Sequence, residues 1–276
     1  MFKNLFRRSS AHPAELATLD SAESTSVRSP KVYRTFAEAS ADCGDGYQAP
    51  DLVKFMRDRF EAALAAGMDF HKLPTMQLIA TVQAASVAAH QNSLRVLDLG
   101  GQFGGHKYWV EAATGLSCQW AVVETPALVG ASNDSDSLKF FSSPTPAIQW
   151  LQRIDLLNLS GVIQFLENAP SMIGSILKAK PRFISVTRTP LSTTDMKFDV
   201  QVSRLFDNGF GPVPAGYVDC EIRYPRILWP DATIKDLFSG YRLAWSTCEG
   251  PTISVDGDFV QEGHVFLFEI DPELPS

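Results

Sequence analysis

A short apolar run that ends in a glycine-rich turn constrains the fold of this chain more than any other feature. Leu94–Leu99 is such a run, and Gly100 and Gly101 follow it directly. An apolar run of this length that stops at glycines is typical of a buried strand. Similar runs follow along the chain, at 120–124, 138–141, 154–159 and 182–187, with helical patterns at 105–114 and 170–178. Strands that alternate with helices predict an α/β fold with a largely parallel sheet.

Two runs near the C-terminus complete the predicted sheet. Residues 241–246 and 265–270 are mostly apolar, and no connecting helix is predicted between them. Parallel neighbours need such a connector, whereas antiparallel neighbours do not. We therefore expect an antiparallel hairpin at one edge of the sheet. The insert at about 192–230, before this hairpin, is rich in Gly, Pro and aromatic residues, which is typical of a lid or an acceptor pocket.

The N-terminal part has a helical pattern. Apolar residues recur at steps of three and four between 52 and 64, which places them on one face of a helix. Pro50 and Asp51 are typical of a helix start, and Gly67 is typical of a stop. A second helix, rich in alanine, is expected at 75–90.

The chain divides into three parts on this pattern. Residues 1–32 carry five basic and three acidic side chains among Ser, Ala, Thr and Pro, which is the composition of a disordered tail. A helical N-terminal segment is expected at 33–92. The α/β domain, with its insert, is expected at 93–276.

The composition argues against several function classes. A net charge of -7 and a pI near 5.2 argue against a nucleic-acid binder, which needs a basic surface. No apolar run reaches the roughly 18 residues of a membrane helix, so no stable membrane insertion is expected. The four cysteines are widely spaced, as in reduced proteins of the cytoplasm. The five histidines lack the spacing of metal ligands, so no metal site is predicted.

Acidic residues stand at the ends of the first two predicted strands. Asp98 precedes the glycines, and Glu124 closes the next strand. Ligands of open α/β sheets bind beyond the carboxyl ends of the strands, and an acid at the position of Glu124 suits the two hydroxyls of a ribose. An acid beside the glycine turn repels phosphate. The pattern therefore favours a cationic ligand without phosphate, such as the amino end of S-adenosylmethionine (SAM), over a dinucleotide.

These segments carry a family resemblance. Residues 96–104, 122–124 and 155–166 together resemble the class I SAM-dependent methyltransferases, which implies a Rossmann-like, mostly parallel sheet with an antiparallel edge hairpin. More narrowly, the chain is similar to a little-characterised branch of bacterial proteins assigned as methyltransferases, often associated with surface-polysaccharide genes. The features of that branch run from 33 to 270.

The resemblance implies SAM as the cofactor and a role for each matching residue. The methionine part would be held at Asp98, Gly100, Gly101 and Gly104, the ribose at Glu124, the adenine at Phe141 and Ser142, and the sulfonium at Ser160 and Gly161. One position departs from the family pattern. No acidic residue follows the third strand, where many relatives bind the adenine amino group.

Further polar residues are candidates for catalysis and acceptor binding. The candidate catalytic residues are His106, Arg188 and Asp199, and the candidate substrate-binding residues are Tyr47, Gln164 and Gln201. His106 follows the glycine turn, and histidine serves as a general base. Arg188 directly follows the fifth strand, and its guanidinium fork suits a carboxylate or a phosphate.

The sequence leaves three functions open. The first is a SAM-dependent methyltransferase that acts on a small polar acceptor, with a sugar hydroxyl as the candidate by analogy. The second is an NAD(P)-dependent oxidoreductase, which shares the sheet and the acidic second strand, although this turn lacks the Gly-x-Gly start. The third is a methyltransferase-like module that binds without catalysis. The acceptor and the oligomeric state are not determined by the sequence.

Overall fold

The computed structural model describes residues 31–67, 73–248, 252–255 and 258–271. The tail predicted at 1–32 falls outside these residues except for Lys31 and Val32. The strands are β1 (Ser93–Leu99), β2 (Ser117–Val123), β3 (Leu138–Phe141), β4 (Leu156–Ser160), β5 (Phe183–Ser192), β6 (Lys197–Arg204), β7 (Glu221–Pro230), β8 (Tyr241–Cys248), β9 (Thr252–Val255) and β10 (Asp258–Ile270).

The α-helices are α1 (Phe36–Ala41), α2 (Pro50–Ala66), α3 (Leu73–Ala89), α4 (Gly105–Thr114), α5 (Pro126–Gly130), α6 (Pro144–Leu151), α7 (Ala169–Leu177) and α8 (Asp231–Leu237), and short 3-10 helices are η1 (Gly46–Gln48), η2 (Ile163–Phe165) and η3 (Leu205–Asp207). The two helices predicted before the sheet are confirmed as α2 and α3. Gly67 caps α2 with a φ of 82°, the left-handed region that favours glycine. No helix in the described part of the chain has the length and apolar character to span a membrane.

The central sheet has the strand order β3-β2-β1-β4-β5-β10-β8. Strands β1 to β5 are parallel to their neighbours in this order, and β10 runs antiparallel to both β5 and β8. The predicted Rossmann-like α/β fold with an antiparallel edge pair is therefore confirmed. Of the two antiparallel strands, β10 lies next to β5, so β8 forms the edge of the sheet. The short β9 pairs with the first residues of β10.

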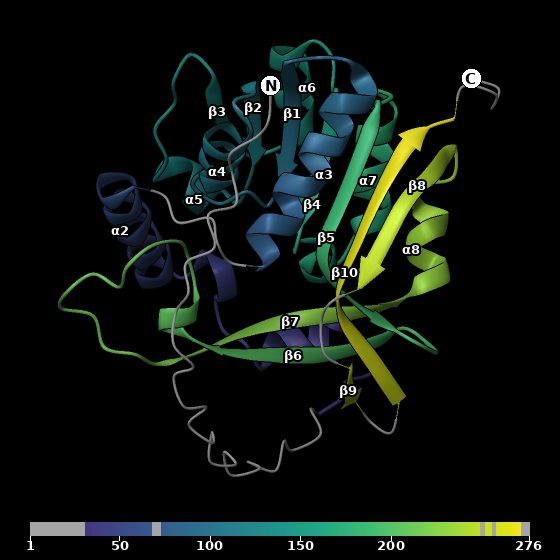
Figure 1. Cartoon of the computed structure of the whole chain (residues 1–276). Coiled ribbons are helices and arrows are strands. Elements are labelled where there is room, and N and C mark those ends of the chain that lie inside the picture. Colours follow the sequence, from purple (N-terminus) through teal and green to yellow (C-terminus); the bar gives the residue numbers. More distant parts are fainter. Residues whose placement is uncertain (1–30, 68–72, 249–251, 256–257, 272–276) are drawn as a thin grey trace, which may run out of the picture.

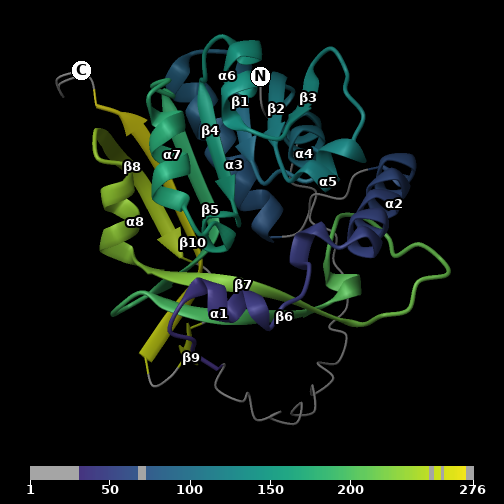
Figure 2. The same cartoon turned by 180° about the vertical axis from the view of Figure 1, so that it is seen from behind.

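Helices cover both faces of the sheet (Figures 1 and 2). Leu97 of β1 packs in one core with Leu151 of α6 and Ile173 of α7. Its neighbour Val96 packs in the opposite core with Val82 of α3, where α4 also packs. Successive side chains of a strand point to opposite faces. Strands buried on both faces read as continuous apolar runs, which explains why the sequence pattern revealed them.

The insert differs from the expected turn-rich segment. Two strands within it, β6 and β7, pair as an antiparallel ribbon, and the end of β7 pairs with the end of β5 through Leu191 and Trp229. Figure 1 shows this ribbon crossing below the sheet, where the parallel strands end. Apolar residues alternate along β6 at Phe198, Val200 and Val202, a pattern typical of strands. The ribbon encloses the space beyond the carboxyl edge.

Candidate functional site

A cavity of about 1360 Å³ lies between the carboxyl ends of the parallel strands and the β6–β7 ribbon. Strands β1, β2 and β4 each contribute a residue at or just after their ends, and β5 contributes Arg188 and Pro190 from its second half. The loop after β3 and both strands of the ribbon complete the lining. Pockets for one ligand are typically about 300–1,000 Å³. The cavity therefore has room for two ligands side by side.

Nine of the fifteen residues predicted from the sequence line this cavity: Tyr47, Gly100, Glu124, Ser142, Ser160, Gly161, Gln164, Arg188 and Gln201. They come from positions that are far apart in the chain. The fold brings the residues after β1 to β4 to one edge because parallel strands in a βαβ sheet all end on the same side. Tyr47, Gln164 and Gln201 reach the cavity from η1, η2 and the ribbon.

Asp98 does not line the cavity. Its side chain is fully buried on the α3–α4 side of the sheet. Trp120 Nε1 donates to Oδ2 at 3.0 Å, and Asn158 Nδ2 donates to Oδ1 at 2.7 Å. His106 Nδ1 lies 2.8 Å from the same Oδ2. The two side chains therefore share a buried hydrogen bond.

The remaining predicted residues outside the lining also have neighbours that explain their placement. His106 is 2% exposed and packs against Trp109 and Phe210. Gly101 and Gly104 lie behind the turn, where an added Cβ would meet Asp98 at 2.3 Å or Leu138 at 2.9 Å.

Phe141 and Asp199 are likewise outside the lining. The Phe141 ring is tilted against Trp150, with 6.1 Å between ring centroids. Asp199 is completely buried and accepts two hydrogen bonds from the Arg226 guanidinium, at 2.9 and 2.7 Å. A carboxylate held in this bidentate way is not free to take a proton from an acceptor.

Glu124 stands at the end of β2 and is half-buried. Its Oε1 accepts from the backbone N–H of Gln102 at 3.1 Å, and its Oε2 accepts from that of Thr125 at 2.9 Å. Burial raises the pKa of this carboxyl to about 7. Each oxygen has a second lone pair, so the group can accept from two adjacent hydroxyls of a ligand.

The turn after β1 comes close to the loop after β4. Gly100 has a φ of 74°, and a Cβ built there would lie 2.5 Å from Val162 Cγ2. Both residues line the cavity. Glycine is needed here for its backbone conformation and for the close approach. The turn therefore presents backbone, rather than side chain, to the cavity.

Arg188 adopts an unusual backbone conformation on β5. Its φ is 55°, in the left-handed region that costs a non-glycine residue roughly 1–2 kcal/mol. Val186 and Thr189 pair with Phe266 and His264 of β10, so β5 has one extra residue between these two pairs. Such a bulge redirects a side chain. Here it directs Arg188 into the lining of the cavity.

Aromatic residues from three elements form one wall of the cavity, and sequence reasoning did not assign two of them to the site. Tyr47 of η1 stacks on Tyr224 of β7 with 3.9 Å between centroids and meets Phe165 of η2 edge-on. The Tyr224 hydroxyl donates to Asn208 Oδ1 at 2.7 Å. Ile222 and Tyr224 alternate with the charged Glu221 and Arg223, so a strand assignment of 221–230 would have indicated Tyr224.

Four residues of the lining carry a buried polar side-chain atom with no hydrogen-bond partner in the described part of the chain. The atoms are Gln102 Oε1, Gln164 Oε1, Arg188 Nε and Arg223 Nε. Buried polar atoms in native proteins are nearly always paired. Four further atoms of this kind, in Gln91, Trp109, Asn158 and Trp229, lie outside the lining. The four in the cavity wall are available to hydrogen-bond a polar ligand. Among the described residues, no cluster of His, Cys, Asp or Glu has the arrangement of a metal site.

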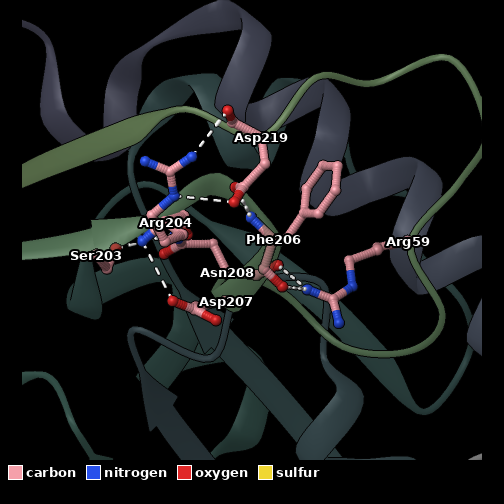
Figure 3. Close-up of polar contacts among 7 residues, drawn as sticks. All are labelled: Arg59, Ser203, Arg204, Phe206, Asp207, Asn208 and Asp219. Atoms are coloured by element: carbon pink, nitrogen blue, oxygen red, sulfur yellow. Dashed lines mark hydrogen bonds and ion pairs between the residues drawn. The ribbon is translucent and has the colours of Figure 1, made fainter. Parts of the chain in front are cut away.

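Arg59 of α2 anchors the loop that follows β6 (Figure 3). Its Nε donates to Gly211 O at 2.8 Å, and its Nη1 donates to the carbonyl oxygens of Phe206 and Asn208 at 2.5 and 2.7 Å. Asp219 holds the same loop by accepting from the Phe206 backbone N–H at 3.1 Å. Since Asn208 binds Tyr224, Arg59 positions the aromatic wall from outside the cavity.

Arg59→Ala is expected to lower the free energy of unfolding by about 2–4 kcal/mol, because it leaves buried carbonyls unpaired. Urea denaturation measures this change. Arg57→Ala on the same helix is the control: its side chain is 38% exposed, and a change within about 0.5 kcal/mol is expected. Equal effects of the two variants would show that Arg59 does not anchor the loop.

No protein-family model matches the chain, and no curated protein matches it by sequence. Among solved structures, a sugar N-methyltransferase from Streptoalloteichus is 12% identical, covers 77% of this chain and 92% of its own, and has a TM-score of 0.45. A SAM-bound amino pentose methyltransferase from Micromonospora echinaspora is 12% identical over 77% of this chain and 96% of its own, with a TM-score of 0.43. A SAM-dependent methyltransferase from Clostridium acetobutylicum is 8% identical over 76% and 96%, with a TM-score of 0.42. Likeness at this level assigns no function to the chain.

Proposed function

We propose that this protein is a SAM-dependent methyltransferase that acts on a small polar acceptor. The observation that carries the proposal is the convergence of the Gly100 turn and the Glu124 carboxylate on one cavity at the carboxyl edge. The carboxylate suits the hydroxyls of a ribose, and the turn admits a ligand close to the backbone. The residues present therefore fit an adenosyl cofactor.

The cofactor site comprises Gly100, Glu124, Ser142, Ser160 and Gly161. SAM held by these residues would supply an activated methyl group for transfer to an oxygen or nitrogen of the acceptor. The protein's own contribution is to hold both partners in line and to exclude water. The cavity volume supports this role, because it exceeds that of one ligand.

Asp98, His106, Gly101 and Gly104 support the turn from behind in this proposal. The hydrogen bond between Asp98 and His106 and the tight packing at both glycines shape the backbone that meets the cofactor. Their role is then to position the turn. Phe141 packs below the adenine region, and Asp199 holds Arg226 in the cavity wall.

We assign the acceptor to Tyr47, Gln164, Arg188 and Gln201, which line the same cavity as the proposed cofactor site. Amide groups of glutamine donate and accept hydrogen bonds, as the hydroxyls of a sugar require. The unpartnered Gln164 Oε1 supports a hydroxyl donor there. A sugar hydroxyl is our candidate for the methylated group.

The test is calorimetric titration with S-adenosylhomocysteine (SAH), the demethylated product, and separately with NAD⁺. We expect SAH to bind and NAD⁺ not to bind. Binding of NAD⁺ alone would favour the oxidoreductase, and binding of SAH without methyl transfer to any acceptor would favour the non-catalytic module.

Gly100→Ala and Gly115→Ala form a matched pair for this titration. Both glycines have a φ near 70°, but a Cβ at Gly100 meets Val162 at 2.5 Å, whereas nothing lies within 4 Å at Gly115. Both variants therefore incur the same backbone strain. We expect Gly100→Ala to weaken SAH binding by about ten-fold or more, since roughly 1.4 kcal/mol suffices, and Gly115→Ala to leave it unchanged. Equal affinities would exclude the Gly100 turn from the site.

A further inference from the structure

The Arg188 guanidinium has few partners for a buried cation. Its Nη2 donates to the Ser160 carbonyl at 3.1 Å, and its Nε is buried without a hydrogen-bond partner in the described part of the chain. No carboxylate of the described residues forms an ion pair with it. Glu124, an acid of the same cavity, is instead bonded to the backbone of Gln102 and Thr125. Buried charges in proteins are normally paired.

The backbone is arranged to place this cation in the cavity. Arg188 sits in the left-handed region on a bulge of β5. Gly161 leaves room for the guanidinium, since a Cβ there would lie 2.9 Å from Nη2. Strained residues of this kind persist only where the surrounding structure enforces them, and they gather at ligand sites. The strain and the missing partner together indicate a ligand for the guanidinium.

The charge of that ligand follows from the neighbouring groups. Two other arginines of the lining are paired within the described residues: Arg223 with Glu221 at 3.3 Å and Arg226 with Asp199 at 2.7 Å, so among the arginines of the cavity Arg188 is the one without a carboxylate partner there. The sulfonium of the proposed cofactor would add a further positive charge near Ser160 and Gly161, and both of these residues lie against the Arg188 guanidinium. Like charges in a half-buried cavity repel strongly. An anionic group bound between the Arg188 guanidinium and the sulfonium would offset the repulsion between these two positive charges.

We propose that the acceptor carries a carboxylate or phosphate group, and that the Arg188 fork binds it beside the transferred methyl group. This inference rests on the proposed methyltransferase function and names the class of acceptor within it. A planar guanidinium binds both kinds of oxyanion through two parallel hydrogen bonds. An acidic sugar or a sugar phosphate combines such a group with the hydroxyls that Gln164 and Gln201 suit.

The experiment titrates SAH-saturated protein with glucuronate, glucose 1-phosphate and neutral glucose, and with inorganic phosphate as the minimal anion. We expect at least one of the two sugar anions to bind about ten-fold or more tightly than glucose, the scale of charged hydrogen bonds. The two sugar anions distinguish a carboxylate from a phosphate. Failure of both anions to bind more tightly than glucose would overturn the inference.

Arg188→Gly tests the residue without straining the fold, because glycine adopts a φ of 55° freely. It should abolish the preference for anions and keep SAH affinity within about three-fold of wild type. Arg188→Lys keeps the charge but loses the fork, and should restore the preference only in part. Arg242→Ala removes an exposed arginine that pairs with Glu269 on the far edge strand, and should change nothing.

The outcomes separate this inference from the function on which it rests. Unchanged anion binding in Arg188→Gly overturns the inference. A loss of SAH affinity in this variant, with the preference for anions kept, also overturns it, because Arg188 would then bind the carboxylate of the cofactor itself. If the wild type binds no SAH, the proposed function fails. The same titrations on the ligand-free protein then decide whether Arg188 binds an oxyanion.

Discussion

Replacing Asp98 with alanine is expected to lower the free energy of unfolding by about 3–5 kcal/mol, the range for breaking a buried charged network. The carboxylate is fully buried and is contacted by Trp120, His106 and Asn158. Alanine would leave their donors without an acceptor in the core. Each unpaired donor carries its own desolvation cost, so the effect exceeds that of losing a single hydrogen bond.

Two further variants make this prediction specific. Asp98→Asn keeps the shape and one acceptor oxygen, so its loss of stability should be smaller than that of Asp98→Ala. Asp136→Ala removes an exposed aspartate from the loop before β3, and should change stability by no more than about 0.5 kcal/mol. Urea denaturation of the ligand-free proteins measures all three. An Asp98→Ala protein with wild-type stability but weakened SAH binding would contradict the supporting role and assign Asp98 to the cofactor.

The sequence predicted that Asp98 lies near the end of β1, but not that its side chain is buried away from the cavity. Its place before the glycines marks the end of β1, which was read correctly. The period of two puts Asp98 on the same face as Val96. Which helices cover that face, and that Trp120 and Asn158 lie beside it, depends on the register of β1 with β2 and β4. No local pattern contains that register.

Glu124 shows the opposite case, in which local position was sufficient: it directly follows β2, and chain topology alone brings such a strand end to the carboxyl edge. Arg188 was predicted to follow the fifth strand directly, but β5 continues to Ser192, and it is the bulge in β5 that directs this side chain into the cavity. The contact between Tyr47 and Tyr224 was beyond the sequence for a different reason. It joins η1 to the β6–β7 ribbon, and the Gly and Pro residues around that ribbon masked its strand pattern.

Glu124 is expected to make the ligand-free protein less stable as pH rises from about 5 to 8. Burial raises its pKa from the ordinary 4.5 to about 7, so the folded state holds a proton that the unfolded chain has lost. The stabilising contribution is complete below pH 4.5 and disappears as pH rises through 7. Across this window the free energy of unfolding should fall by up to about 3 kcal/mol.

Glu124→Gln removes this titration, and should lack the decline. Glu61→Gln, which changes an exposed glutamate of α2, should retain it. Urea denaturation at pH 5, 6, 7 and 8 gives the comparison. Parallel pH profiles for wild type and Glu124→Gln would contradict a raised pKa at Glu124.

Ligand binding should respond to pH in the opposite direction. Ribose hydroxyls donate to the ionised carboxylate, which is the minor form below pH 7 and the major form above it. SAH affinity should therefore rise about ten-fold between pH 6 and pH 8, and binding at pH 7 should release about half a proton. Calorimetry in buffers with different heats of ionisation measures that proton.

The comparison with Glu124→Gln isolates this residue from the titration of the ligand itself. Both proteins meet the same SAH at each pH, so the ratio of their affinities depends on the protein alone. We expect that ratio to favour wild type by about ten-fold or more at pH 8, where a charged hydrogen bond is lost in the variant, and to narrow toward pH 6. A ratio that stays constant from pH 6 to 8 would mean that the carboxylate does not bind the ribose, and the adenosyl site would have to lie elsewhere in the cavity.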